Sequence, residues 1–201
     1  MTSILGKGAE AVLVREGTTV CKERGVKAYR HPELDRTLRT FRTRREAKIL
    51  ETLHRAGVPV PAVKRFDDRA CVIVMDFLDG PKLKDVLAQD PERYGREVGI
   101  LIGRMHEKGV IHGDLSTSNM IASPPGIVLI DFGLGSFSNA GEHRAVDLHV
   151  LEQIVHANHT LVASEFWRAF ATAYEGSFFE APAVLKRLEA VRKRGRNKMK
   201  F

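Results

Sequence analysis

Three oxygen-bearing side chains occur in an order that suits phosphoryl transfer. Asp114 and Asn119 lie five residues apart in Ile111-His112-Gly113-Asp114-Leu115-Ser116-Thr117-Ser118-Asn119, and Asp131 follows in Ile130-Asp131-Phe132-Gly133. Phosphoryl transfer from a nucleoside triphosphate needs one carboxylate that faces the accepting hydroxyl or water. It also needs an amide and a second carboxylate that hold the metal. H-x-D-x-x-x-x-N followed by D-F-G, joined by strand-like residues, rarely arises by chance.

Each of these residues has a predicted role. Asp114 is the candidate catalytic carboxylate, and Asn119 and Asp131 are candidate ligands of Mg²⁺, a cation that takes oxygen ligands. The alternative is that Asp114 and Asn119 cap the loop and that Asp131 makes a strand-end turn. We expect His112 to hold the loop by packing and hydrogen bonding, not to act as a base.

A lysine on an expected strand is the candidate phosphate-binding cation. Lys22 lies in Thr19-Val20-Cys21-Lys22, and an ammonium buried in a β-rich run needs a counter-charge or a phosphate. Glu46, in the middle of an expected helix, is the predicted partner, which would orient Lys22 toward phosphates. Lys27 and Glu51 are the competing choices. The alternative is a surface ion pair worth at most about 1 kcal/mol.

A glycine-containing segment precedes this lysine. In Gly6-Lys7-Gly8-Ala9-Glu10-Ala11 the glycines would let the backbone approach phosphates, although Ala11 stands where a third glycine would complete the pattern. The candidate nucleotide-binding residues here are Gly6, Gly8, Ala9 and Glu10. An ordinary hairpin turn is the alternative. Farther along, Met75 and Phe77 mark a segment whose backbone is expected to meet an adenine edge.

Size and composition indicate a globular protein. The 201 residues are 43% hydrophobic, which suits one compact unit or two small lobes around a core. No apolar run is long enough to span a bilayer and the first residues show no signal-peptide pattern, so a cytoplasmic location is expected. Cys21 and Cys71 are expected to be free thiols in a reducing compartment. The formal charge is +7, and the basic residues cluster in residues 36–55 and in the last residues. These clusters are either solvated faces or contacts to an anionic partner.

The local patterns predict a β-rich first part and a helical second part. Strands are expected at 3–5, 11–15, 18–23, 60–66, 70–77 and 126–130. Helices are expected at 33–56, 91–108, 144–159, 163–174 and 181–193. The expected inward positions are Leu38, Phe41, Ile49, Leu50 and Leu53 in the first helix and Val98, Leu101, Ile102 and Met105 in the second.

These elements predict an α+β fold with two lobes. The N-lobe would span residues 1–77 and hold one main helix. Residues 78–81, Leu-Asp-Gly-Pro, would form the linker, and residues 82–193 a reduced helical C-lobe. Residues 194–201 are expected to form a basic flexible tail.

The motifs resemble those of the protein-kinase fold over nearly the whole chain, from Gly6 to the helices after Asp147. The chain departs from that pattern in two ways. The catalytic loop reads His-Gly-Asp, and no Ala-Pro-Glu follows Asp131-Phe132-Gly133. The segment to Asp147 is also short, and the absence of a long activation loop and of Ala-Pro-Glu argues against broad phosphorylation of proteins.

The chain more specifically resembles the small atypical serine/threonine kinase/ATPase subunits of the KEOPS complex. The residues that carry this resemblance are Gly8–Ala11, Lys27-Ala28-Tyr29-Arg30-His31-Pro32-Glu33-Leu34-Asp35, Arg42-Thr43-Arg44-Arg45-Glu46-Ala47, Ile111–Ile121, Leu129–Gly135, Ala145-Val146-Asp147-Leu148 and the basic end from Arg192 to Arg196. The resemblance implies use of ATP and Mg²⁺, autophosphorylation and ATPase activity.

The same resemblance implies partners. That family assembles with a threonylcarbamoyl-transferase subunit and small accessory subunits, and the complex makes the threonylcarbamoyl-adenosine modification of tRNA. The resemblance also implies that the basic end contacts a partner or RNA, through Arg192, Lys193, Arg194 and Arg196. No membrane contact is implied.

Three alternatives remain open from the sequence. A small-molecule phosphotransferase of the aminoglycoside or choline kinase type also uses His-Gly-Asp followed by Asn, but Asp131-Phe132-Gly133 and residues 27–35 count against it. A compact atypical kinase of the ribosome-maturation type is disfavoured by residues 27–35 and 42–47. A non-catalytic scaffold that binds nucleotide is the third, although no catalytic position is missing.

Overall fold

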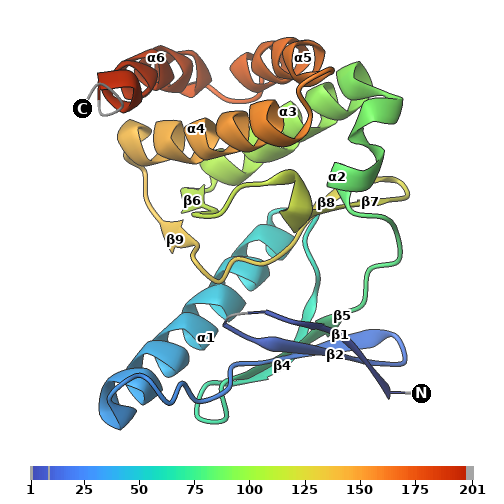
Figure 1. Ribbon diagram of the computed structural model, residues 1–201, viewed down its shortest axis with the longest axis vertical. Coiled ribbons are helices and arrows are strands. Elements are labelled where there is room, and N and C mark those ends of the chain that lie inside the picture. Colours follow the sequence, from blue (N-terminus) through green and yellow to red (C-terminus); the bar gives the residue numbers. More distant parts are fainter. Residues whose placement is uncertain (1, 9, 198–201) are drawn as a thin grey trace. The chain divides into compact units, whose positions relative to one another are not determined.

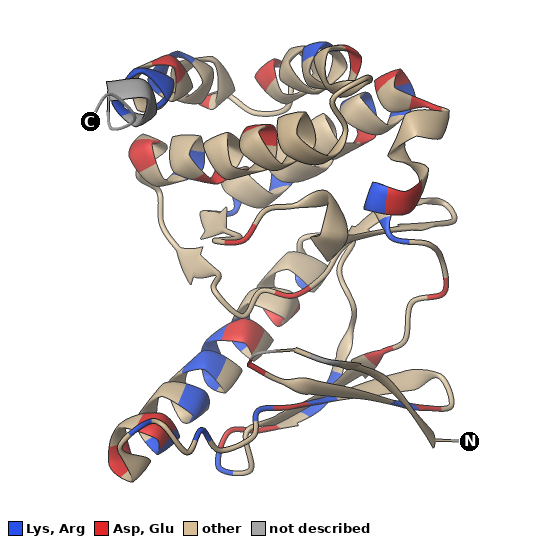
Figure 2. Ribbon diagram, in the orientation of Figure 1, with Lys and Arg blue, Asp and Glu red and all other residues tan. Residues whose placement is uncertain are grey.

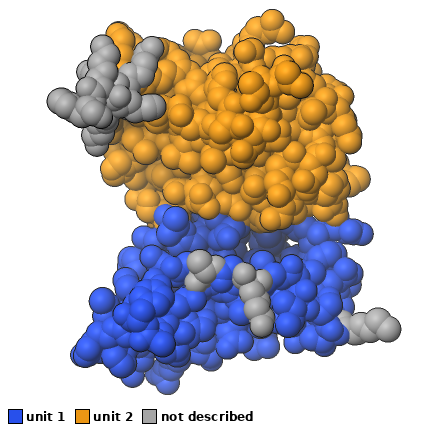
Figure 3. Space-filling view, viewed as in Figure 1, with its two compact units in different colours: residues 1–79, 131–134 blue, residues 80–130, 135–201 orange. Residues whose placement is uncertain are grey.

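The computed structural model describes residues 2–8 and 10–197, without the side chains of residue 7 and residues 195–197. The chain forms two compact units (Figure 3). Unit 1 comprises Met1–Asp79 and Asp131–Leu134, and unit 2 comprises Gly80–Ile130 and Gly135–Phe201. The first division therefore falls inside the expected linker 78–81. In contrast to the expected lobes, residues 131–134 group with unit 1.

An antiparallel sheet of five strands forms the base of unit 1 (Figure 1), in the order β1-β2-β3-β5-β4. Lys22 lies on the central strand β3, where it is paired with Leu13 on one side and Ile73 on the other. The Glu16-Gly17 turn signal is confirmed, since Gly17 has a φ of 62° between β2 and β3. The strands are β1 (Thr2–Lys7), β2 (Val12–Glu16), β3 (Thr19–Glu23), β4 (Val63–Asp67) and β5 (Val72–Asp76).

Helix α1 (Pro32–Arg55) packs against β4 and β5 of the same unit. Its predicted inward residues Ile49, Leu50 and Leu53 are buried. The prediction was wrong for Phe41, which is 55% exposed. The Arg45 guanidinium lies 4.9 Å from the centre of the Phe41 ring, so a cation covers this ring in place of the core.

The helices of unit 2 form its core. All four predicted inward residues of α3 are buried, which confirms the 3.6-residue pattern. Asp90 caps this helix by accepting a hydrogen bond from the Arg93 backbone N–H at 3.1 Å. The helices are α2 (Leu83–Val86), α3 (Pro91–Glu107), α4 (Gly141–Asn158), α5 (Ala163–Glu175) and α6 (Ala181–Asn197).

Helices α3 and α5 approach each other closely because α3 presents glycines to α5. A Cβ added to Gly95 would lie 2.4 Å from the Phe166 carbonyl oxygen, and one added to Gly99 would lie 2.5 Å from that of Phe170. No side chain fits at these distances. The close approach lets the buried aromatic residues of α5 reach the interior of the unit.

Short strands of unit 2 hold the loop that contains Asp114. Strand β6 (Val110–Ile111) precedes the loop and pairs with β9 (Ser136–Phe137). A 3-10 turn at Thr117–Asn119 ends it, and β7 (Met120–Ser123) then pairs with β8 (Gly126–Leu129). Of these strands only β8 was predicted, because runs of two to four residues carry little periodic signal.

The end of α6 differs from the sequence-based expectation. This helix was expected to end at residue 193 and to be followed by a flexible tail, but it continues to Asn197. Residues 198–201 of the expected tail lie outside the described residues. The mixed α+β class is confirmed. Among the described helices, none is long and apolar enough to cross a membrane.

Candidate functional site

Lys22 is buried in unit 1 and holds two carboxylates. Its Nζ donates to Glu46 Oε1 at 2.7 Å and to Asp131 Oδ1 at 2.8 Å. Burial alone would lower the pKa of Lys22, but the charges of Glu46 and Asp131 outweigh burial and raise it. The ammonium is therefore charged and fixed in place. The ion pair with Glu46 that the sequence predicts is present, whereas its nucleotide role stays a prediction.

Glu46 binds a second cation that sequence reasoning missed. Arg24 Nη2 donates to Glu46 Oε2, while Lys22 occupies Oε1. The Arg24 side chain is 2% exposed and that of Glu46 is 1% exposed. The available signal was the spacing of Arg24, which lies two residues after Lys22 and one residue beyond β3, because alternate residues of an extended chain point to the same face.

Asp131 belongs to unit 1, where it contacts Lys22 and its own loop. It has a φ of 63°, a backbone region that L residues other than Asn and Asp rarely adopt. The Gly133 backbone N–H also donates to Asp131 Oδ1, at 3.2 Å. The side chain is 51% exposed, so the carboxylate can still reach a ligand in solution.

The glycine-containing segment is tied to the rest of unit 1 by Glu10. Arg30 Nη2 donates to Glu10 Oε1 at 3.1 Å, and Arg42 Nη1 donates to Oε2 at 2.7 Å. Burial would raise the pKa of Glu10, but hydrogen bonds and charges from these two arginines lower it. Gly6 lies in β1, and the Gly8 N–H donates to the Ala11 carbonyl at 2.9 Å. Ala9, a predicted nucleotide-binding residue, lies outside the described residues.

The expected adenine-contact residues lie at the end of β5. Met75 is in the strand and pairs with Val20. The Phe77 backbone N–H already donates to the Thr18 carbonyl at 2.9 Å, and the Arg15 guanidinium lies 3.7 Å from the Phe77 ring centre. An adenine contact through Phe77 would therefore use its carbonyl, not its N–H.

In unit 2, the Asp114 loop is closed by Asn119. Asn119 Nδ2 donates to the Asp114 carbonyl at 2.9 Å and to Asp114 Oδ2 at 3.0 Å. The Asp114 carboxylate is exposed. Because Nδ2 makes both of these bonds, the amide oxygen of Asn119 remains the atom suited to a hard cation.

His112 has the structural role expected from the sequence. Its side chain is buried, and its Nε2 lies 3.1 Å from the Ile130 carbonyl, to which it donates. Its Nδ1 faces the Asp114 backbone N–H at 3.4 Å. The backbone N–H groups of His112 and Gly113 donate to the two carboxylate oxygens of Asp147, at 2.8 and 2.9 Å. The imidazole thus holds the loop and is not placed as a base.

A buried polar chain extends from Asp147 and was missed by sequence reasoning. Asp147 Oδ2 lies 3.3 Å from His106 Nε2, and His106 Nδ1 lies 2.8 Å from the Tyr174 hydroxyl. Burial lowers the pKa of His106 and raises that of Tyr174, so both groups are neutral. A signal was present in the sequence, since Asp147 and His106 occur among the apolar positions of their helices.

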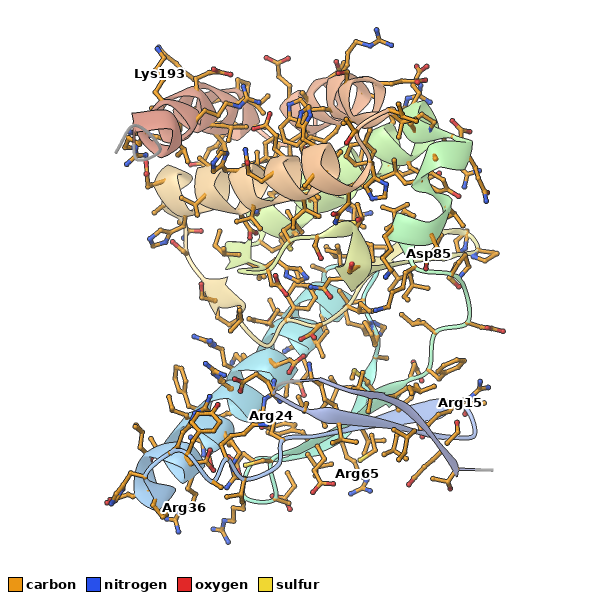
Figure 4. All side chains as sticks on the ribbon, viewed as in Figure 1. Arg15, Arg24, Arg36, Arg65, Asp85 and Lys193 are labelled. Carbon is orange, nitrogen blue, oxygen red and sulfur yellow. The ribbon has the colours of Figure 1, made fainter. Side chains whose placement is uncertain are left out.

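Two of the four predicted contact residues at the basic end pair with glutamates of unit 2. Arg192 Nε donates to Glu152 Oε2 at 2.8 Å, and Arg194 pairs with Glu142. Lys193 is exposed on α6 (Figure 4). The side chain of Arg196, the fourth predicted residue, lies outside the described part of the chain. Figure 2 marks in blue the positions of Lys and Arg along α1 and α6.

Each unit contains groups whose chemistry suits an ATP–magnesium ligand. Lys22 is a buried cation with fixed orientation, and Asp131 and Asn119 provide oxygen donors. In the described ranges, no group of three or more His, Cys, Asp or Glu side chains could hold a metal by itself. Mg²⁺ typically needs only one or two protein carboxylates because phosphates and water complete its shell.

Comparisons with known proteins identify relatives. Residues 15–140 match the family model described as RIO domain. The chain is 40% identical over 195 residues to the "EKC/KEOPS complex subunit BUD32" of Encephalitozoon cuniculi, covering 96% of this chain and 94% of that protein. It is 45% identical over 144 residues to the "KEOPS complex subunit Bud32" of Pyrococcus abyssi, covering 70% and 66%.

Another group of relatives is longer. The chain is 38% identical over 198 residues to the "Probable bifunctional tRNA threonylcarbamoyladenosine biosynthesis protein" of Methanosarcina mazei. That match covers 96% of this chain but only 35% of the relative, so the chain spans about a third of it.

A solved structure matches the fold. The Rio2 kinase of Chaetomium thermophilum, in a structure described as an ADP/Mg²⁺-phosphoaspartate complex, has a TM-score of 0.65 at 19% identity. The match covers 98% of this chain and 70% of that chain. At this identity the likeness shows the kinase-like fold alone, which confirms the predicted fold class.

Proposed function

We propose that this chain, which belongs to the RIO-domain family and within it to the KEOPS subunits named Bud32, is an ATP- and Mg²⁺-dependent atypical kinase or ATPase that supports threonylcarbamoyladenosine modification of tRNA. The observation that best supports this proposal is the buried Lys22, held between Glu46 and Asp131. An ammonium fixed between two carboxylates is a preorganised phosphate-binding group.

The other residues have roles that follow from their chemistry. Asp114 would orient the attacking hydroxyl or water, and Asn119 and Asp131 would hold the magnesium ion through oxygen atoms. A bound Mg²⁺ supplies charge neutralisation of the phosphates. Asp147 and His112 keep the Asp114 backbone in place, so Asp114 needs no reorganisation when substrate arrives.

The names of the relatives support an assembly. The Methanosarcina mazei relative is described as bifunctional and this chain matches about a third of it. We propose that the chain assembles with a threonylcarbamoyl-transferase subunit and small accessory subunits and acts on tRNA through that complex. The two free cysteines support a reducing, cytoplasmic location.

The test is ATP hydrolysis with Mg²⁺, measured on the chain alone and with the transferase subunit and tRNA. Turnover should depend on Asp131 and rise with the partner, so Asp131→Ala should reduce it by at least about 100-fold. Asp85→Ala is the matched control, because Asp85 is an exposed aspartate on α2 (Figure 4) and should leave turnover unchanged. ATP binding without turnover in every mixture would favour a scaffold and contradict the proposal.

A second variant addresses the phosphate acceptor. The absence of Ala-Pro-Glu from the sequence supports water as the acceptor in the complex. Asp114→Asn should then abolish both ATP hydrolysis and tRNA modification by the reconstituted complex. Loss of hydrolysis with tRNA modification intact would show that hydrolysis does not drive the modification.

A further inference from the structure

The buried cluster around Glu46 contains more cations than anions. The side chains of Lys22, Arg24 and Glu46 are 6%, 2% and 1% exposed. These three groups carry two positive charges and one negative charge. Arg45 adds a further cation nearby, since burial and the charges of Arg42 and Arg24 lower its pKa. Since an uncompensated buried charge is costly, the cluster favours one more anion.

In this structure Asp131 provides that anion, through its contact with Lys22. Asp131 is half exposed, unlike the other three groups, and it is also the proposed metal ligand. If its carboxylate binds a cation, Lys22 loses part of this counter-charge. The remaining buried cluster then has a net positive charge that a phosphate can neutralise.

The two oxygens of Glu46 are divided between the two cations. Arg24 takes Oε2 through a guanidinium N–H, and Lys22 takes Oε1. Without Arg24, Lys22 and Glu46 would form a neutral pair, and Lys22 would have little charge left for another anion. With Arg24, the carboxylate is already neutralised.

We propose that Arg24 is a positioning residue that neutralises Glu46 and thereby leaves the charge of Lys22 available to the phosphates of a nucleoside di- or triphosphate. This inference rests on the nucleotide site of the proposed function. Arg24 acts through Glu46.

The surroundings of Arg24 fit this role. Arg24 Nη1 lies 3.5 Å from Thr43 Oγ1 on α1, and its backbone carbonyl accepts from Arg39 Nη1 at 3.3 Å. The guanidinium also lies against the 131–133 turn, since a Cβ built on Gly133 would be 3.3 Å from Arg24 Nη2. Figure 4 labels Arg24 beside α1. Arg24 is thus fixed by α1, by Arg39 and by the turn that contains Asp131.

The test compares ligands with and without phosphates. Calorimetric titrations with ADP and with adenosine are made on the full chain at one ionic strength. Arg24→Gln should weaken ADP binding by about tenfold or more while adenosine binding changes by less than about twofold. Arg24→Lys keeps the charge and should restore most of the ADP affinity. Arg65→Gln is the matched control, because Arg65 is an exposed arginine on β4 of the same unit and should leave ADP binding unchanged.

A double variant shows whether the effect passes through Glu46. The double variant Arg24→Gln/Glu46→Gln has no carboxylate at position 46, so the charge of Lys22 is available to phosphates. ADP should therefore bind to it at least about threefold more tightly than to Arg24→Gln alone. If Arg24→Gln fails to fold in a thermal unfolding assay, the double variant is compared with Glu46→Gln. Without the Glu46 carboxylate, loss of Arg24 should then change ADP affinity by less than about threefold.

The outcomes separate this inference from the proposed function. Equal loss of ADP and adenosine binding in Arg24→Gln would show a structural role and overturn the inference. Unchanged ADP binding in Arg24→Gln, or a double variant no better than the single one, would overturn it too. If the wild-type chain does not bind ADP at all, the proposed nucleotide site fails, and the inference with it.

Discussion

The Tyr174 hydroxyl lies 2.8 Å from His106 Nδ1, and this contact links α5 to the loop that contains Asp114. His106 contacts Asp147, whose two oxygens accept the backbone N–H groups of His112 and Gly113. Because the Asp147 carboxylate can only accept, the neutral imidazole donates to it from Nε2, and Nδ1 accepts from the Tyr174 hydroxyl. The order of the Asp114 loop therefore depends on residues of α3, α4 and α5 that lie outside the loop.

Removal of the hydroxyl at position 174 should weaken this loop. Tyr174→Phe leaves His106 Nδ1 buried without a donor, so the free energy of unfolding should fall by about 1–3 kcal/mol. Hydrogen exchange of the His112 and Gly113 amides should also become faster. Tyr29→Phe is the control, since Tyr29 is 76% exposed and should have no effect. Unchanged exchange at these amides would contradict the link.

The lowered pKa of His106 predicts a loss of stability in acid. Its usual pKa is about 6.5, and burial lowers that value in the folded state. Between the two pKa values the unfolded chain binds more protons, so stability is fully present above about pH 6.5 and falls as the pH decreases. The free energy of unfolding should be about 1 kcal/mol lower at pH 5.5 than at pH 7.5. His106→Gln should reduce this difference, whereas the exposed His156→Gln should preserve it.

Because Lys22 and Arg24 share the Glu46 carboxylate, loss of Glu46 should destabilise the protein more than loss of Lys22. Glu46→Ala leaves Lys22 and Arg24 buried without this anion, and should lower the free energy of unfolding by about 3–5 kcal/mol. Lys22→Met leaves Glu46 paired with Arg24, and should cost less than about 2 kcal/mol. Chemical denaturation of both variants measures the difference. Equal costs would mean that Arg24 does not compensate Glu46.

The close approach of α3 and α5 predicts a sensitive glycine. Gly99→Ala would place a Cβ 2.5 Å from the Phe170 carbonyl, so the helices must separate, at a cost of about 1–3 kcal/mol. Gly176→Ala has no atom within 4 Å of the new Cβ and should be neutral. Thermal unfolding distinguishes the two variants. A Gly99→Ala variant as stable as the wild type would show that this helix contact can relax.

Substitutions of a paired and of an exposed basic residue on α6 should have different effects on stability and on anion binding. Arg192→Gln loses its pair with Glu152 and should lower stability, because Glu152 is buried. Lys193→Gln should leave stability unchanged, and should weaken tRNA binding and flatten its salt dependence if α6 contacts RNA. The matched pair is assayed by thermal unfolding and by tRNA titration at several salt concentrations. An unchanged salt slope in Lys193→Gln would indicate a solvated or protein-facing lysine.

Local patterns were sufficient for much of the fold. The position of Lys22 in a β-rich run and of Glu46 in the middle of an expected helix predicted their ion pair. The helical spacing predicted the buried face of α3. The same spacing misplaced Phe41, since a periodic pattern cannot show that Arg45 covers the ring. The short strands β6 and β9 stabilise each other only after the chain has brought them together.

Contacts between distant residues account for most of what the sequence could not show. Lys22 and Asp131 are 109 residues apart in the chain, and the left-handed backbone of Asp131 has no signature in its residue type alone. Arg192 appears in the sequence as part of a basic run, but its partner Glu152 is on α4. The carboxylates that neutralise a cluster have to be located in space before its function can be judged.

The pairing of α6 with α4 changes the electrostatic potential that a distant polyanion would meet. Glu142 neutralises Arg194 and lies 3.6 Å from Arg187, and Glu152 neutralises Arg192. The positive potential at a distance from this helix is therefore weaker than its number of arginines indicates. Lysines such as Lys193 contribute a larger share of that potential. Steering of tRNA toward α6 would then depend on groups that acetylation can neutralise, while the arginines that fasten the helix keep their charge.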